Sequence, residues 1–190
     1  NMTAGTASLV DSLRINEIMA NPLPGEDDWL ELLNLNATLP LSLDGLHFRF
    51  NEHVVGLSPN SFLEAGGIGV LFANDAARRE SLRFRISSLG GQLDLLDARG
   101  NLIDQVSFRL QAEGASLGRL PNGTGGFRVF SNQATPGQEN ALRDLSTIVI
   151  NEIMARNQSV AYAGVGGTPD WIELANITDN AVDVGGMSLR

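Results

Sequence analysis

The sequence predicts an all-β protein, a β-sandwich of about seven to nine short strands followed by an incomplete second repeat. Three observations lead to this fold class. Short apolar segments are separated by turn residues at spacings near the roughly 8–12 residues typical of β-sandwiches. Glycine, which is common in turns, accounts for 21 of the 190 residues. A block at residues 15–34 recurs at residues 150–176, and such a repeat sets the architecture of a chain.

Two motifs make up the repeat. INEIMA occupies residues 15–20 and 150–155, and D-W-x-E-L-x-N occupies residues 28–34 and 170–176. The polar spacer between the motifs is seven residues longer in the second occurrence. We therefore expect the same pair of strands in both places, joined by loops of different length.

The first strand, residues 13–20, is expected to contain a β-bulge. Its apolar residues lie on both sides of Asn16–Glu17, where the alternation changes parity, and one extra residue in a strand has this effect. Residues 21–27 contain Pro and Gly and are expected to form a loop. Residues 74–81 have the pattern of a short helical turn.

The second strand, residues 28–34, alternates in polarity. Leu30 and Leu32 point to one side, and Trp29 and Glu31 point to the other, which is typical of a half-buried strand. Further strands are expected at residues 45–50, 68–73, 91–96, 101–108, 116–120 and 127–130.

Composition and charge limit the classes of function. Hydrophobic residues make up 43% of the chain and charged residues 18%, as in globular proteins that bury a core. No run approaches the roughly 20 apolar residues that cross a bilayer, so no membrane span is expected. The formal net charge of −9 argues against nucleic acid partners, which require a basic face. The absence of cysteine excludes disulfides and Cys-based zinc sites.

Further motifs follow the first repeat block. They are a G-x-x-x-x strand start at residues 45–50, S-S-x-G-x-x-L-x-L-x-D-x-x-G-x-x-I-D-x-V-x-F at residues 87–108, S-x-G-R-x-P-N-G at residues 116–123 and T-P-G-x-x-N at residues 135–140. In this order, and together with the first block, they resemble the lamin-tail domain family, in its bacterial branch, over residues 13–142. The resemblance implies an immunoglobulin-like β-sandwich. It also implies a non-enzymatic module for protein binding or structural spacing in a larger exported protein, located outside the cell or on its surface.

The resemblance divides the chain into four segments. Residues 1–12 are an N-terminal extension or tag remnant, in which no signal peptide is visible. Residues 13–142 are the complete lamin-tail-like domain. Residues 143–147 are a linker, and residues 148–190 match only the start of a second copy.

This truncated second repeat has the residues of only two or three strands. A piece of that size is marginally stable alone, so its apolar side chains need cover. We expect it to pair with a sheet edge of its own first domain or of another molecule, or to remain mobile. A protein partner, or self-association through this repeat, is therefore the interaction that the sequence predicts.

Repeated carboxylates offer a candidate metal site at Glu17, Asp28 and Glu31. Carboxylate oxygens around a Gly-containing loop are ligands that Ca²⁺ prefers, so Ca²⁺ is the cofactor that these residues suggest. In the other interpretation, Asp28 caps a turn and Glu17 accepts hydrogen bonds from backbone donors at the bulge. The metal interpretation favours a second function, a Ca²⁺- or carbohydrate-binding accessory module of a secreted enzyme. The three carboxylates recur as Glu152, Asp170 and Glu173.

Candidate partner-binding residues are one tryptophan and an arginine cluster. Trp29 is either a buried residue of the sandwich or an aromatic platform for a sugar or peptide. The arginines either blunt an exposed edge strand or bind an anion or a partner. They are Arg78, Arg79, Arg83 and Arg85.

No catalytic residue is predicted. His47 and His53 flank the turn at Asn51–Glu52. If they faced each other across a hairpin they would suit zinc, although exposed histidines near a turn are the commoner arrangement. The chain has no G-x-S-x-G nucleophile motif, and its glycine groups lack the lysine of a phosphate-binding loop.

Overall fold

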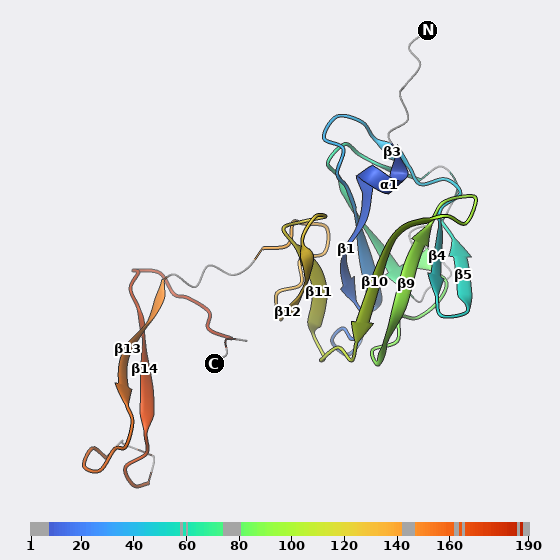
Figure 1. Cartoon of the computed structure of the whole chain (residues 1–190). Coiled ribbons are helices and arrows are strands. Elements are labelled where there is room, and N and C mark those ends of the chain that lie inside the picture. Colours follow the sequence, from blue (N-terminus) through green and yellow to red (C-terminus); the bar gives the residue numbers. More distant parts are fainter. Residues whose placement is uncertain are drawn as a thin grey trace. The chain divides into compact units, whose positions relative to one another are not determined.

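The computed structural model describes residues 8–57, 59, 61–73, 81–141, 147–161, 164, 166–185 and 187. The chain divides into two compact units, Asn1–Leu142 (unit 1) and Arg143–Arg190 (unit 2) (Figure 1). Both units are built from β-strands, so the all-β prediction is confirmed. No helix in the described part of the chain is long and apolar enough to cross a bilayer.

The described part of unit 1 contains twelve strands and one four-residue helix, α1 (Leu9–Ser12). Three of the strands are only two residues long, and the other nine lie within the predicted number. The strands are β1 (Leu13–Met19), β2 (Asp28–Asn34), β3 (Leu41–Ser42), β4 (His47–Phe50), β5 (His53–Gly56), β6 (Phe62–Leu63), β7 (Ile68–Ala73), β8 (Ser81–Leu82), β9 (Gly90–Leu96), β10 (Leu102–Arg109), β11 (Ala115–Leu120) and β12 (Gly126–Ser131). The helical turn expected at residues 74–81 lies outside the described residues except for Ser81, which begins β8.

Two sheets face each other in unit 1. The six-stranded sheet has the order β12-β11-β1-β2-β7-β8, and the four-stranded sheet has the order β10-β9-β4-β5. All neighbours are antiparallel except β7 and β8. The core fills the space between the sheets, since alternate residues of both contribute apolar side chains to it. Its largest fully buried members are Leu13, Ile15, Ile18, Leu30, Leu32, Leu46, Phe48, Leu82, Leu93 and Leu95.

The two sheets are offset by two strands. β10, at one edge of the four-stranded sheet, lies against β1, where the Ile15 amide donates to Asp104 Oδ2 at 2.9 Å. Arg119 of β11 completes this contact with an ion pair to Asp104 at 3.0 Å. Because β1 is the third strand of the larger sheet, β11 and β12 extend past the edge formed by β10 (Figure 1).

The predicted bulge in β1 is confirmed. Ile15 pairs with Leu32, whereas the next register pair joins Glu17 to Glu31, so Asn16 is the extra residue. The bulge keeps Ile15 in the core and places Glu17 on the outer face of the six-stranded sheet.

The prediction that β2 is half-buried is wrong, because all seven of its residues are buried. The outer face is covered by residues 132–141, which we call the strap. Its contact with β2 is direct, since the Gly137 amide donates to Glu31 Oε2 at 2.9 Å. Alternation in the sequence identifies the two faces of a strand but not what covers the polar one.

Unit 2 contains one hairpin in its described part, formed by β13 (Ile148–Met154) and β14 (Trp171–Asn176). Its register repeats that of β1 and β2. Ile150 pairs with Leu174, and the next pair joins Glu152 to Glu173. The prediction of the same strand pair in both repeats is therefore confirmed, including the bulge.

Candidate functional site

A buried polar network lies between the strap and the outer face of the six-stranded sheet. Its centre is Asn16, the extra residue of the β-bulge in β1, so its side chain does not follow the alternation of the strand. Asn16 Nδ2 donates to Glu31 Oε1 at 2.8 Å and to Asn122 Oδ1 at 3.0 Å. The Gly123 amide donates to Asn16 Oδ1 at 2.8 Å. One side chain thus joins β1, β2 and the turn between β11 and β12.

Glu17 is fully buried and accepts hydrogen bonds from both sides. Ser116 of β11 donates its hydroxyl to Glu17 Oε1. Thr135 of the strap donates its amide and its hydroxyl to Glu17 Oε2, at 3.3 and 3.2 Å. Burial raises the pKa of Glu17 despite these donors, because desolvation disfavours the charged form.

Glu31, the register partner of Glu17, is also fully buried. Burial raises its pKa to about 7, and the charge of Glu17 acts in the same direction. Hydrogen bonds from Asn16 and Gly137 oppose this rise. The two carboxyl groups are therefore acceptors in a closed network, where burial favours their protonation and the hydrogen bonds that they accept oppose it.

Asn140 attaches the end of the strap to the sheet. Its Nδ2 donates to the carbonyl of Asn16 at 3.2 Å and to that of Arg119 at 3.1 Å. Its amide donates to Asn122 Oδ1 at 2.8 Å, and Asn122 Nδ2 donates back to its carbonyl at 3.1 Å. A Cβ at Gly118 would come within 2.6 Å of Asn140 Nδ2, so β11 needs glycine where the strap crosses it.

The structure brings two of the three predicted metal ligands together. Glu17 and Glu31 are adjacent, but Asp28 lies apart and accepts a hydrogen bond from the Ile86 amide at 3.1 Å. Burial raises the pKa of Asp28, while Arg85 acts to lower it. The described residues contain no group of three or more His, Cys, Asp or Glu side chains placed to hold a metal ion.

The other predicted site residues are scattered. Arg83 and Arg85 are exposed, and Arg78 and Arg79 lie outside the described residues. Arg85 and Asp28 line a cavity of about 500 Å³ together with the loop at residues 20–26. Trp29 is only 6% exposed, so its ring is part of the protein interior.

The structure does not place His47 opposite His53, as the alternative of a zinc site would require. In the β4–β5 hairpin His47 pairs with Gly56, and His53 pairs with Phe50. The tight turn sets this register, and it places the two imidazoles at opposite ends of the ladder.

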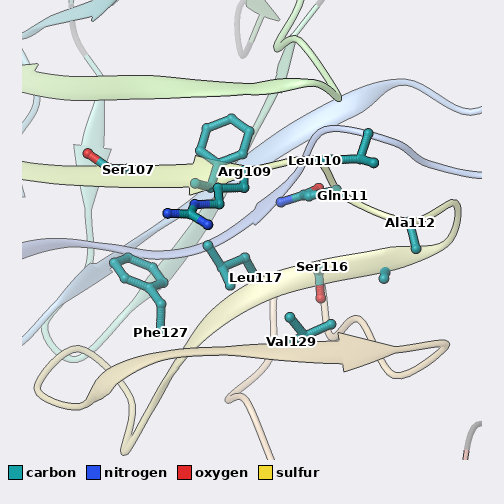
Figure 2. A pocket seen from close by; sticks show the side chains of 11 residues that line it. Ser107, Arg109, Leu110, Gln111, Ala112, Ser116, Leu117, Phe127 and Val129 are labelled. Atoms are coloured by element: carbon teal, nitrogen blue, oxygen red, sulfur yellow. The ribbon is translucent and has the colours of Figure 1, made fainter.

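A groove that the sequence did not reveal lies where the two sheets are offset. It has a volume of about 520 Å³ and opens between β10 and the β11–β12 pair (Figure 2). Leu117, Phe127 and Val129 form its floor, and Leu110 lies at its rim. Leu110 is 70% exposed and Val129 is 64% exposed.

The apolar face of the β13–β14 hairpin is a second open surface. Ile150, Ile153, Ile172 and Leu174 are 52%, 59%, 46% and 41% exposed. Their counterparts in unit 1 are at most 1% exposed; these are Ile15, Ile18, Leu30 and Leu32. The same local sequence thus forms the same hairpin in both units, but only one hairpin is covered.

No model of a known protein family matches the chain, and no curated protein is similar to it. The structure therefore defines the class as an all-β protein with a β-sandwich unit and a second unit whose described part contains one β-hairpin. The lamin-tail resemblance stays a prediction from the motifs.

Proposed function

We propose that this chain is a non-catalytic, immunoglobulin-like interaction module of the lamin-tail type, belonging to a larger exported bacterial protein. In this proposal it binds protein partners or itself, outside the cell or on its surface. The single observation that carries the proposal is the exposed apolar face of a correctly registered hairpin in unit 2.

Strand pairing is the mode of interaction that this hairpin supports best. Among the described strands, β13 pairs only with β14, so each has one edge without a neighbour. A two-stranded hairpin gains stability from further strands, and exposed edges recruit them by main-chain hydrogen bonds. In unit 1 the equivalent strands have β11 and β7 as neighbours.

The buried network supports a structural role for the motifs of unit 1. The polar residues of these motifs form hydrogen bonds within the protein. Asn16 donates to Glu31, the Gly137 amide donates to Glu31, and Asn140 donates to the carbonyl of Asn16. Such satisfied buried groups specify a fold. They do not require a substrate or an ion.

The test compares the wild-type chain with Ile153→Glu by light scattering over a range of concentrations. We expect the wild type to gain mass with concentration and the variant to remain monomeric, because a buried unpaired charge opposes association. Hydrogen exchange of the β13 and β14 amides provides a second readout. A wild type that stays monomeric, with fast-exchanging hairpin amides at every concentration, would refute self-association as the interaction of this module.

A further inference from the structure

The offset between the two sheets of unit 1 leaves a specific gap. The larger sheet has six strands and the smaller has four. Since β10 lies against β1 through the contact of Ile15 with Asp104, the inner faces of β11 and β12 have no strand over them in the described part of unit 1. The gap is therefore two strands wide.

The floor of this gap is apolar. Leu117 of β11 pairs with Val129 of β12, and Arg119 pairs with Phe127. The Arg119 guanidinium lies 4.3 Å from the centre of the Phe127 ring and is held by Asp104 and the carbonyl of Ile15. These contacts hold Arg119 and Phe127 in place, so this part of the groove is formed before any partner binds.

The wall of the gap is an open strand edge. Among the described strands β10 pairs only with β9, and its last residues, Ser107 to Arg109, line the groove, so this end of its other edge can accept a further strand. Val106 and Phe108 of β10 are buried in the core, and Ser107 and Arg109 alternate with them on the exposed face. A strand added here extends the four-stranded sheet beneath β11.

The β13–β14 hairpin has the dimensions of the missing piece. It has two strands, and the seven residues of β13 compare with the eight of β10. Its alternation places Ile150, Ile153, Ile172 and Leu174 on one face. The other face carries the register pair Glu152–Glu173 between the pairs Met154–Trp171 and Val149–Ala175.

Charge favours the same arrangement. When the hairpin extends the sheet from β10 with its apolar face toward Leu117 and Val129, alternation places Glu152 and Glu173 on the face that carries Arg109. Arg109 is the charged residue among those that line the groove. Opposite charges on neighbouring strands stabilise a sheet by roughly 0.2–1 kcal/mol per pair, and they select the orientation of the added hairpin.

We infer that the groove between β10 and the β11–β12 pair receives the β13–β14 hairpin of a second copy of this chain. The inference rests on the proposed function, which it makes specific by naming the partner and its binding site. The occupant is the hairpin of a second copy, as the self-association in the proposed function requires, and a hairpin that filled the groove of its own chain would leave the wild type monomeric. The contact is head-to-tail, so each copy presents one groove and one hairpin.

The test uses two full-length variants, each defective in one partner of the contact. Val129→Glu charges the groove, and Ile153→Glu charges the hairpin. Both positions are exposed in their own units, so neither substitution opens a packed core. Val54→Glu, at an exposed apolar position on β5, is the matched control and should associate as the wild type does. Melting curves of the full-length chains check that Val129→Glu and Val54→Glu fold, and circular dichroism compares the strand content of Ile153→Glu with that of the wild type.

Light scattering of the variants alone and mixed gives the result. We expect each of the two variants to be monomeric alone and their equimolar mixture to form a dimer and no larger species. The mixture contains one intact groove and one intact hairpin per pair of chains, which is the signature of a head-to-tail contact.

Three outcomes overturn the inference. If Val129→Glu associates alone while Ile153→Glu does not, the hairpin pairs with another hairpin, and the proposed function survives without the groove. If the two variants stay monomeric when mixed, the surfaces do not bind each other. If the wild type is monomeric throughout, both this inference and self-association fail.

Discussion

Glu17 and Glu31 face each other across the β1–β2 ladder, and the strap binds both carboxyl groups through Thr135 and Gly137. Two acidic side chains at adjacent buried positions would repel if both were charged. Here burial raises the pKa of each, and the hydrogen bonds from the strap and from β11 satisfy their oxygens. Both residues belong to the repeated motifs, and the protonation of their buried carboxyl groups contributes to the stability of unit 1.

The first prediction concerns pH. A carboxyl group whose pKa rises from 4.5 in the unfolded chain to about 7 in the fold, as at Glu31, binds more protons when folded. Its contribution to stability is therefore complete below about pH 4.5 and is lost as the pH rises through about 7. Glu17 acts in the same direction. We expect the free energy of unfolding in urea to fall by on the order of 2 kcal/mol between about pH 5 and pH 8.

Glu31→Gln should flatten this pH dependence, since its side chain does not titrate. Glu113→Gln, at an exposed position, is the matched control and should keep the wild-type slope. A slope that is unchanged in Glu31→Gln would show that Glu31 does not titrate across this range.

The second prediction concerns the end of the strap. Asn140→Ala removes the two donors that reach the carbonyls of Asn16 and Arg119, which leaves buried acceptors without partners. We expect a loss of about 1–3 kcal/mol in the free energy of unfolding. Gln138→Ala, two residues earlier on an exposed part of the strap, should change it by less than about 0.5 kcal/mol. Equal effects of the two substitutions would contradict the anchoring role of Asn140.

The third prediction concerns the close approach of the strap to β11. In Gly118→Ala the new methyl group would overlap Asn140 Nδ2, which lies 2.6 Å from an ideal Cβ. We expect a loss of about 1–3 kcal/mol in unfolding free energy and faster hydrogen exchange at Gly137 and Asn140. Gly126→Ala has no atom within 4 Å of its Cβ and should be nearly neutral. A stable Gly118→Ala with a protected strap would mean that the strap tolerates displacement.

The fourth prediction concerns Ca²⁺. Protein donors already bind the carboxylate oxygens of Glu17 and Glu31, so an ion at this pair would have to displace the strap. We expect millimolar Ca²⁺ to leave the melting temperature of unit 1 the same as in EDTA. A clear rise with Ca²⁺, as for a ligand that binds only the native state, would favour the accessory-module function instead.

The repeat, the bulge at Asn16 and most of the longer strands of unit 1 are predictable because they are local, whereas β5 and the two-residue strands β3, β6 and β8 were not expected. Side-chain alternation and turn residues determine them within a few positions. The burial of Glu31 is not predictable from local patterns. It depends on the strap, whose contact with β2 joins residues more than one hundred positions apart in the sequence. The groove beside Leu117 could not be predicted from the sequence either. It results from the offset between the two sheets, which follows from the strand order, and local patterns do not encode strand order.

The attachment of Asn140 to the carbonyl of Asn16 spans 124 positions, and this separation has a consequence for the timing of folding. Chains emerge from the ribosome N-terminus first, so the first hairpin of unit 1 is synthesised long before the segment that covers its carboxyl groups. Distant contacts of this kind slow folding, because they require the closure of a long loop. Unit 1 therefore completes its fold only after its last residues have been made, and until then the strap does not cover Glu17 and Glu31 on the outer face of β1 and β2.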